Sequence, residues 1–134
     1  KIKKIKIFDN YLDQNDFKTI QNAILNEGFP WFYSPIVVSE DENPELDKFQ
    51  FYNTLCVKNE VKSSFYNLLD PLIKKISPSY IYRVKVNLGT RTSTPIVGGF
   101  HSDTDFNNTT AIFYLNNNNH LNLDIDSYKS FLTT

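Results

Sequence analysis

The 134-residue sequence has one cysteine, Cys56, one tryptophan and no methionine. A single cysteine excludes an internal disulfide, so apolar packing must hold the fold together. Cys56 has no histidine or arginine beside it in the sequence, which predicts a packed small hydrophobe and not a reactive thiol. The absence of methionine indicates that Lys1 is not the native start of the chain.

Other absences narrow the class of protein. No apolar run approaches the roughly 18 residues of a membrane span, and no signal peptide precedes the fold, so we expect a cytoplasmic protein without a membrane partner. The net charge of −1 and pI of about 6.1 leave no basic footprint for nucleic acid. Lysine and isoleucine alternate over residues 1–6, which favours an edge strand with solvated lysines over a basic binding patch.

The chain is rich in aromatic residues, with 11 Phe and 8 Tyr, and 40% of its residues are hydrophobic. This composition predicts a packed single domain over residues 1–134 and argues against disorder. The aromatic cluster at 29–33 is expected to pack in the core, although it could line a pocket. Residues 39–47 are acidic and turn-rich, as in a solvated loop.

Hydrophobic periodicity predicts both helices and strands. We expect a helix from an Asp13 N-cap to a stop at Gly28, and a second over 61–76 that either kinks at Pro71 or restarts with Asp70 as its cap. The expected strands cover residues 2–8, 49–57, 80–88 and 109–116, with a short one near Tyr33. This pattern suits an α+β chain whose helices pack on an antiparallel jelly roll.

One short motif carries chemistry: His101 and Asp103 form an H-x-D pair that follows Gly98-Gly99. In an extended chain, residues i and i+2 point the same way, roughly 6.6 Å apart, so both side chains can converge on one cation. Two histidines and one carboxylate bind iron in non-haem Fe(II) oxygenases, and this pair would supply two of the three ligands. The alternative is a surface turn, since Ser102 and Thr104 are common turn residues.

Four segments in order resemble the 2-oxoglutarate- and Fe(II)-dependent oxygenases of the prolyl-4-hydroxylase-like branch over about residues 5–118. They are Ile7-Phe8-Asp9-Asn10-Tyr11-Leu12, Arg83-Val84-Lys85-Val86-Asn87-Leu88, Phe100-His101-Ser102-Asp103 and Ala111-Ile112-Phe113-Tyr114-Leu115-Asn116. The resemblance implies a double-stranded β-helix (jelly roll), Fe(II) held by His101 and Asp103, and 2-oxoglutarate and O2 as cosubstrates. It also implies that the Tyr114 hydroxyl helps to hold the distal carboxylate of 2-oxoglutarate. A core tyrosine is the alternative for Tyr114.

The sequence departs from this family after Asn116, so the jelly roll is expected to be incomplete at the C-terminus, with 117–134 as an atypical tail. The distal histidine of the family and its basic residue for the cosubstrate carboxylate have no match. His120 would have to fold back to become the third ligand, and a tail residue without a role is the expectation. Asp105 and Arg91 are expected to be solvated side chains, although Asp105 could support the metal ligands and Arg91 could contact the substrate. The tyrosine that related enzymes often carry near Leu88-Gly89 is also missing.

Three hypotheses follow from the sequence. The chain is an Fe(II)/2-oxoglutarate dioxygenase that hydroxylates a protein side chain, such as prolyl, or a small molecule. Alternatively it is a catalytically silent jelly-roll binding module that keeps part of the site. The third is a truncated or frameshifted product whose genuine reading frame ends near Asn119.

Overall fold

The computed structural model describes residues 6–35, 49–90 and 106–116. Its elements are α1 (Gln14–Ile24), β1 (Phe32–Ser34), β2 (Gln50–Val57), β3 (Glu60–Val61), the 3-10 helix η1 (Ser64–Leu69), α2 (Asp70–Ile76) and β4 (Arg83–Leu88). The chain divides into two compact units, and all of these elements belong to the second unit, Asn10–Ser39 with Asn43–Arg91. The described parts of the first unit are residues 6–9 and 106–116.

Helix α1 begins as the sequence predicts and ends earlier. The Asp13 carboxylate accepts a hydrogen bond from the Asp16 backbone N–H at 2.9 Å, which satisfies one of the open donors of the first turn. The helix was expected to run to Gly28 but stops at Ile24. The side chain of Asn26 accepts from the Gly28 N–H at 3.2 Å, and this local turn competes with further helical hydrogen bonding.

The second predicted helix is divided into two pieces. Ser63 accepts from the Phe65 N–H at the start of η1, and α2 then begins at Asp70 with Pro71 in its first turn. Proline fits there because no helical hydrogen bond is needed from its nitrogen. Of the two predicted alternatives, a kink or a new helix at Pro71, the structure has the new helix. Its cap position is occupied by Leu69 and not by Asp70, which is the first helical residue.

Strand β2 is the centre of an antiparallel sheet. It pairs with β1 through Phe32↔Tyr52 and with β4 through Thr54↔Lys85, and β3 pairs with its far end. The strands expected at 49–57 and 80–88 are confirmed in shorter form. The two-residue turn Lys58-Asn59, with φ of 49° and 61°, joins β2 to β3, and such positive values are typical of tight hairpins.

A bulge in β2 changes which residues enter the core. The pairing passes from Thr54↔Lys85 to Cys56↔Val84, so Leu55 is the extra residue. Leu55 and Cys56 are consecutive, yet both are fully buried. Simple alternation had placed Cys56 on the face of Tyr52 and Thr54, and this expectation is wrong because the bulge turns the Cys56 side chain to the helix side.

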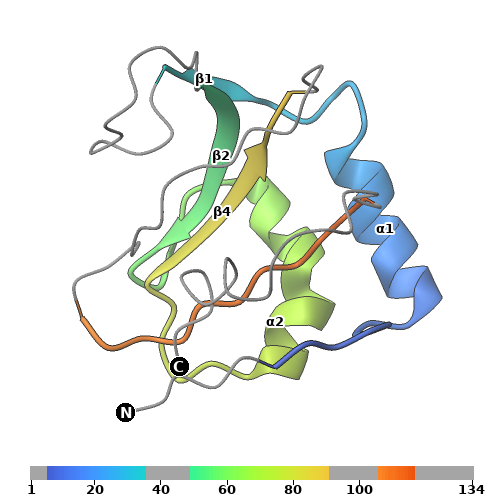
Figure 1. The fold of residues 1–134 in the computed structure, drawn as a ribbon, viewed down its shortest axis with the longest axis vertical. Helices are drawn as coiled ribbons and strands as arrows, with labels where there is room; N and C mark the ends of the chain where they lie inside the picture. Colours follow the sequence, from blue (N-terminus) through green and yellow to red (C-terminus); the bar gives the residue numbers. More distant parts are fainter. Residues whose placement is uncertain (1–5, 36–48, 91–105, 117–134) are drawn as a thin grey trace. The chain divides into compact units, whose positions relative to one another are not determined.

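The helices cover one face of the sheet, with α1 and α2 on the same side of β2 and β4 (Figure 1). The buried apolar side chains are Leu12, Ile20, Ile24, Phe29, Leu55, Cys56, Leu69 and Leu72. The Phe29 ring packs edge-on against Trp31 and Phe65, with centroids 4.8 and 4.9 Å away. Burying a side chain of this size contributes about 1.5–3 kcal/mol, so this layer holds the sheet and helices together.

The α+β class is confirmed by the mixture of helices and antiparallel sheet. The described residues contain one sheet, and the second sheet of a jelly roll is not among them. The strand expected at 109–116 is wrong, because the structure describes these residues without a strand, and residues 6–8 likewise form none. Exposure still alternates from Ile112 to Asn116, but alternation alone provides no ladder of hydrogen bonds.

The longest helix in the described ranges, α1, has 11 residues. No described helix has the length and apolar character needed to cross a bilayer, for which about 20 residues are required.

Candidate functional site

The predicted iron ligands lie outside the described residues. His101 and Asp103 fall in the range 91–105, as do Arg91 and Asp105, and His120 falls in 117–134. Strand β4 ends at Leu88, shortly before that range. The assignment of His101 and Asp103 as metal ligands therefore stays a prediction from the sequence.

Tyr114 is the one predicted site residue that the structure describes. It lies in the first unit, its side chain is 48% exposed, and its backbone is in neither a helix nor a strand. Its predicted role toward the cosubstrate remains a prediction.

No group of three or more His, Cys, Asp or Glu side chains within the described ranges could hold a metal ion. Both histidines of the chain, His101 and His120, are outside those ranges. A metal site would thus need at least one ligand from outside the described residues, and the H-x-D segment is the one that the sequence predicts. The donors of that segment, an imidazole and a carboxylate, fit Fe(II) by their chemistry, since both are ligands of the facial triad.

The described sheet presents a second feature on the side away from the helices. Residues directly paired across antiparallel strands share a face, and the register places Phe32, Tyr52 and Asn87 in one row and Thr54 beside Lys85 in the next. We call this side the cationic face; it consists of Phe32, Tyr52, Thr54, Arg83, Lys85 and Asn87. The opposite side carries Asn53, Leu55 and Cys56 against the helices.

The cationic face carries two cations on β4, and its Arg83 row continues through Val57 to Glu60 of β3. Strands β1, β2 and β4 contain Arg83 and Lys85 and neither aspartate nor glutamate. The Lys85 Nζ lies 4.9 Å from the centroid of the Tyr52 ring, a cation–π contact that orients the ammonium. Phe32, with its ring centroid 6.1 Å from that of Tyr52, is 54% exposed. This arrangement places a held ammonium beside two aromatic rings on one side of the sheet.

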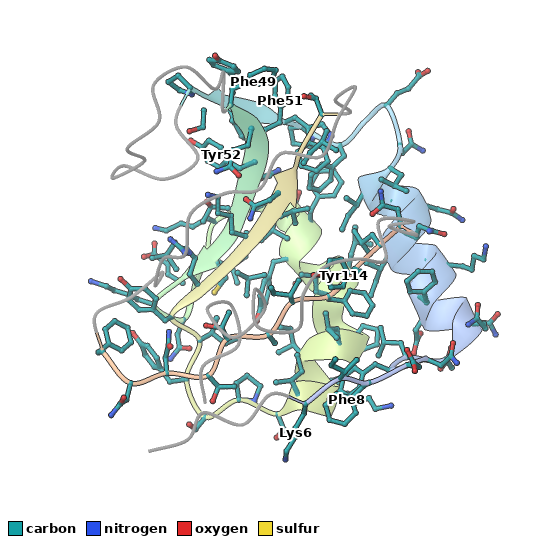
Figure 2. All side chains as sticks on the ribbon, viewed as in Figure 1. Lys6, Phe8, Phe49, Phe51, Tyr52 and Tyr114 are labelled. Carbon is teal, nitrogen blue, oxygen red and sulfur yellow. The ribbon has the colours of Figure 1, made fainter. Side chains whose placement is uncertain are left out.

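A group of three aromatic rings lies on the other side of the same sheet end. Tyr33, Phe49 and Phe51 contact one another with ring centroids 5.8 to 6.2 Å apart, and Figure 2 shows Phe49 and Phe51 at the β1 end of β2. Tyr33 is 59% exposed. The aromatic segment 29–33 therefore divides: Phe29 is core, as expected, whereas Phe32 and Tyr33 are not.

The single thiol is not a candidate nucleophile. Cys56 is 1% exposed, and burial raises the pKa of its thiol, with the charge of Glu60 acting in the same direction. Burial likewise raises the pKa of the Tyr66 hydroxyl. A buried thiol with a raised pKa is protonated at neutral pH and unreactive, so Cys56 packs as a small hydrophobe, as predicted.

Sequence reasoning had put Arg83, Lys85 and Asn87 on one side of their strand, and the pairing register agrees. It did not connect them with Tyr52 and Thr54. The available signal was that both segments alternate with period two, but alternation does not reveal which residues stand opposite each other.

No protein-family model, curated protein or solved structure matches this chain. Function must therefore be argued from the residues themselves.

Proposed function

We propose that this protein is an Fe(II)- and 2-oxoglutarate-dependent oxygenase, similar to the prolyl-4-hydroxylase-like branch, that hydroxylates a protein side chain or a small molecule. The observation that carries the proposal is the H-x-D pair His101/Asp103, followed within the same chain by the segment Tyr114-Leu115-Asn116. The order of elements supports it, because a helix and an antiparallel sheet precede the pair. The finer proposal is that this sheet is one layer of a jelly roll.

The two ligands would act in defined protonation states. His101 would coordinate through a neutral imidazole nitrogen, and Asp103 through its ionised carboxylate, so that the pair supplies one negative charge to a divalent ion. With only two protein ligands assigned, we expect weaker binding than a complete triad provides. When bound, iron with 2-oxoglutarate and O2 supplies oxidising chemistry that no amino-acid side chain can perform.

Tyr114 is proposed to bind the cosubstrate and not the metal. Its hydroxyl would donate a hydrogen bond to the distal carboxylate of 2-oxoglutarate, and such charge-assisted bonds are stronger than those between neutral groups. Replacing Tyr114 with Phe should weaken 2-oxoglutarate binding while metal affinity stays unchanged.

A Mn(II) titration followed by electron paramagnetic resonance tests the metal site directly. Manganese prefers similar ligands and is stable in air, so it can stand in for Fe(II). His101→Ala and Asp103→Ala should each lower affinity by tenfold or more, about 1.4 kcal/mol. Asp105→Asn is the matched control for a nearby carboxylate and His120→Ala for the second imidazole, and both should bind as the parent does. Equal binding by the His101 and Asp103 variants would refute the proposal, and loss in His120→Ala would make His120 the third ligand.

A catalytically silent binding module is the second candidate. It is favoured by the sequence after Asp103, which contains one further histidine, His120, and no arginine. Metal binding without any consumption of 2-oxoglutarate or O2 would support this alternative.

A further inference from the structure

We propose that three aromatic side chains at one end of the sheet bind a quaternary ammonium group, the trimethylated lysine side chain of a partner protein. They are Tyr33 of β1, Phe51 of β2 and Phe49, which directly precedes β2, and we call them the aromatic trio. The inference goes beyond the proposed oxygenase and does not depend on it. All three residues belong to the second unit, so the geometry of one sheet carries the argument.

The first support is position. Tyr33 is directly paired with Phe51 between β1 and β2, and Phe51 with Leu88 between β2 and β4, so these side chains form one row across the sheet. Phe49 is two positions before Phe51, and alternate residues of an extended chain point to the same side. Figure 2 labels Phe49 and Phe51 together at this end of the sheet. Because Tyr33 is 59% and Phe49 38% exposed, the helices leave this end of the face accessible to a ligand.

The second support is the geometry of the rings. Their centroids form a triangle with sides of 5.8, 5.8 and 6.2 Å, and a cation above its middle can lie about 5 Å from all three, within the range of a cation–π contact. The planes of the rings are inclined to one another by 39°, 62° and 90°, so the trio is not a parallel stack that presents a single face. Among the described residues, the cation–π contacts are Lys75 with Tyr11 and Lys85 with Tyr52, and no described lysine occupies the trio.

The third support is the chemistry of the surrounding strands, which favours a methylated ammonium over a bare one. Strands β1 and β2 contain neither aspartate nor glutamate, so no carboxylate of theirs can replace the water that a lysine ammonium loses on binding. A quaternary ammonium has no N–H group to satisfy, and aromatic rings recognise it by its charge and its methyl groups. Leu88 adds an apolar side chain at the end of the same row.

The fourth support is charge complementarity, which favours a peptide as the carrier of this group. Residues 35–48 join β1 to β2 at this end of the sheet, and their sequence contains five carboxylates and one lysine. Negative charge attached to both strands attracts a basic peptide at a distance and repels the phosphate of a phosphocholine headgroup. The partner is therefore a protein segment that carries a trimethylated lysine, and not a lipid surface.

The test compares a charged guest with a neutral one of the same shape. Three capped, glycine-rich peptides are titrated into the full 134-residue chain with EDTA present, and amide and ring shifts are followed by NMR. The first peptide contains trimethylated lysine, the second unmodified lysine, and the third an isostere in which carbon replaces the quaternary nitrogen. Shifts caused by the first peptide should gather at Tyr33, Phe49 and Phe51, and the other two peptides should bind about tenfold or more weakly.

Three variants complete the design. Tyr33→Leu removes one ring but keeps an apolar side chain, and it should weaken binding about threefold or more. Tyr33→Trp should bind at least as tightly as the parent, since tryptophan is the best cation–π partner. Phe32→Leu is the matched control because Phe32 is the next residue of β1, is 54% exposed and faces the other side of the sheet, so this variant should bind as the parent does. Unchanged amide shifts away from each substitution establish that the variant is folded.

The outcomes are decisive in both directions. Preference for the trimethylated peptide that is lost in Tyr33→Leu and kept in Phe32→Leu would support the inference. Equal affinity for the neutral isostere, equal weakening by Tyr33→Leu and Phe32→Leu, shifts that gather elsewhere, or no binding would each overturn it. Phosphatidylcholine vesicles carry the same trimethylammonium group, and sedimentation of the chain with these vesicles in the absence of peptide binding would likewise contradict a protein partner.

Discussion

Asn53 is the one polar residue buried within the described core, and it provides a sharp test of the packing. Its side chain is 4% exposed, and its Nδ2 donates to the Pro30 carbonyl oxygen at 3.0 Å, which ties β2 to the segment leading into β1. Asn53→Ala removes the donor and leaves that carbonyl without this partner. A net hydrogen bond contributes about 0.5–1.5 kcal/mol and an unsatisfied buried group costs about 1–3 kcal/mol, so we expect a loss of about 2 kcal/mol.

Asn53→Asp sharpens the same prediction because its effect depends on pH. At pH 7 the introduced carboxylate would be buried beside a carbonyl oxygen, and an uncompensated buried charge costs about 3–5 kcal/mol. Burial raises the pKa of such a carboxyl above its value of about 3.9 in the unfolded chain, so the folded state favours the neutral form. Stability should therefore be best below about pH 4, where the neutral carboxyl can donate to Pro30, and should fall as the pH rises through the folded pKa.

The assay is urea unfolding at pH 4 and pH 7, with Asn87→Asp as the matched control. Asn87 is an exposed asparagine on β4 of the same sheet, and its substitution should change stability by no more than about 0.5 kcal/mol. The reasoning is refuted if Asn53→Asp costs no more than Asn87→Asp at pH 7, or if its cost does not decrease at pH 4.

Two further predictions concern β2 and its turn. Burial raises the pKa of the Cys56 thiol, so the contribution of this thiol to stability is complete below about pH 8.5 and declines as the pH rises through the folded pKa. In urea unfolding at a series of pH values, the stability of Cys56→Ala should therefore change less above about pH 8.5 than that of the parent. Lys58 has a φ of 49°, a left-handed backbone conformation that a β-branched residue adopts poorly and glycine adopts freely. Lys58→Val should therefore lower the free energy of unfolding by about 1 kcal/mol, and Lys58→Gly should not lower it. Equal melting temperatures for the two variants would contradict a left-handed turn at this position.

Much of the fold follows from short-range rules in the sequence. Asp13 marks the start of α1 because its side chain accepts from a backbone donor three residues ahead, and Pro71 marks the restart at α2 because proline is tolerated only in a first turn. Other features depend on partners distant in the sequence. To predict the end of α1 at Ile24, one must know the turn that competes with the helix. To predict that 109–116 forms no strand, one must know which strands are its partners. Hydrophobic periodicity contains neither kind of information.

The two candidate sites also differ in whether they depend on neighbouring residues or on residues distant in the sequence. The H-x-D pair is recognised by spacing alone, so the sequence identifies His101 and Asp103 without any knowledge of the fold. The cationic face, by contrast, requires the register of β2 against β4, and the bulge at Leu55 decides which residue of β2 stands opposite Arg83. Without the extra residue, Leu55 would pair with Val84 and Cys56 would stand opposite Arg83, because a shift of one residue exchanges the two faces of a strand.

The bulge thus separates two kinds of surface on one strand. It places Leu55 and Cys56 together in the core, and it leaves Val57 opposite Arg83 at the end of the cationic face. Apolar burial on the helix side holds β2 at this register, since shifting it would expose two fully buried side chains, at a cost of about 1.5–3 kcal/mol for Leu55 alone. The contact of Lys85 with Tyr52 lies before the bulge, so it depends on the pairing of Tyr52 with Asn87 and of Thr54 with Lys85.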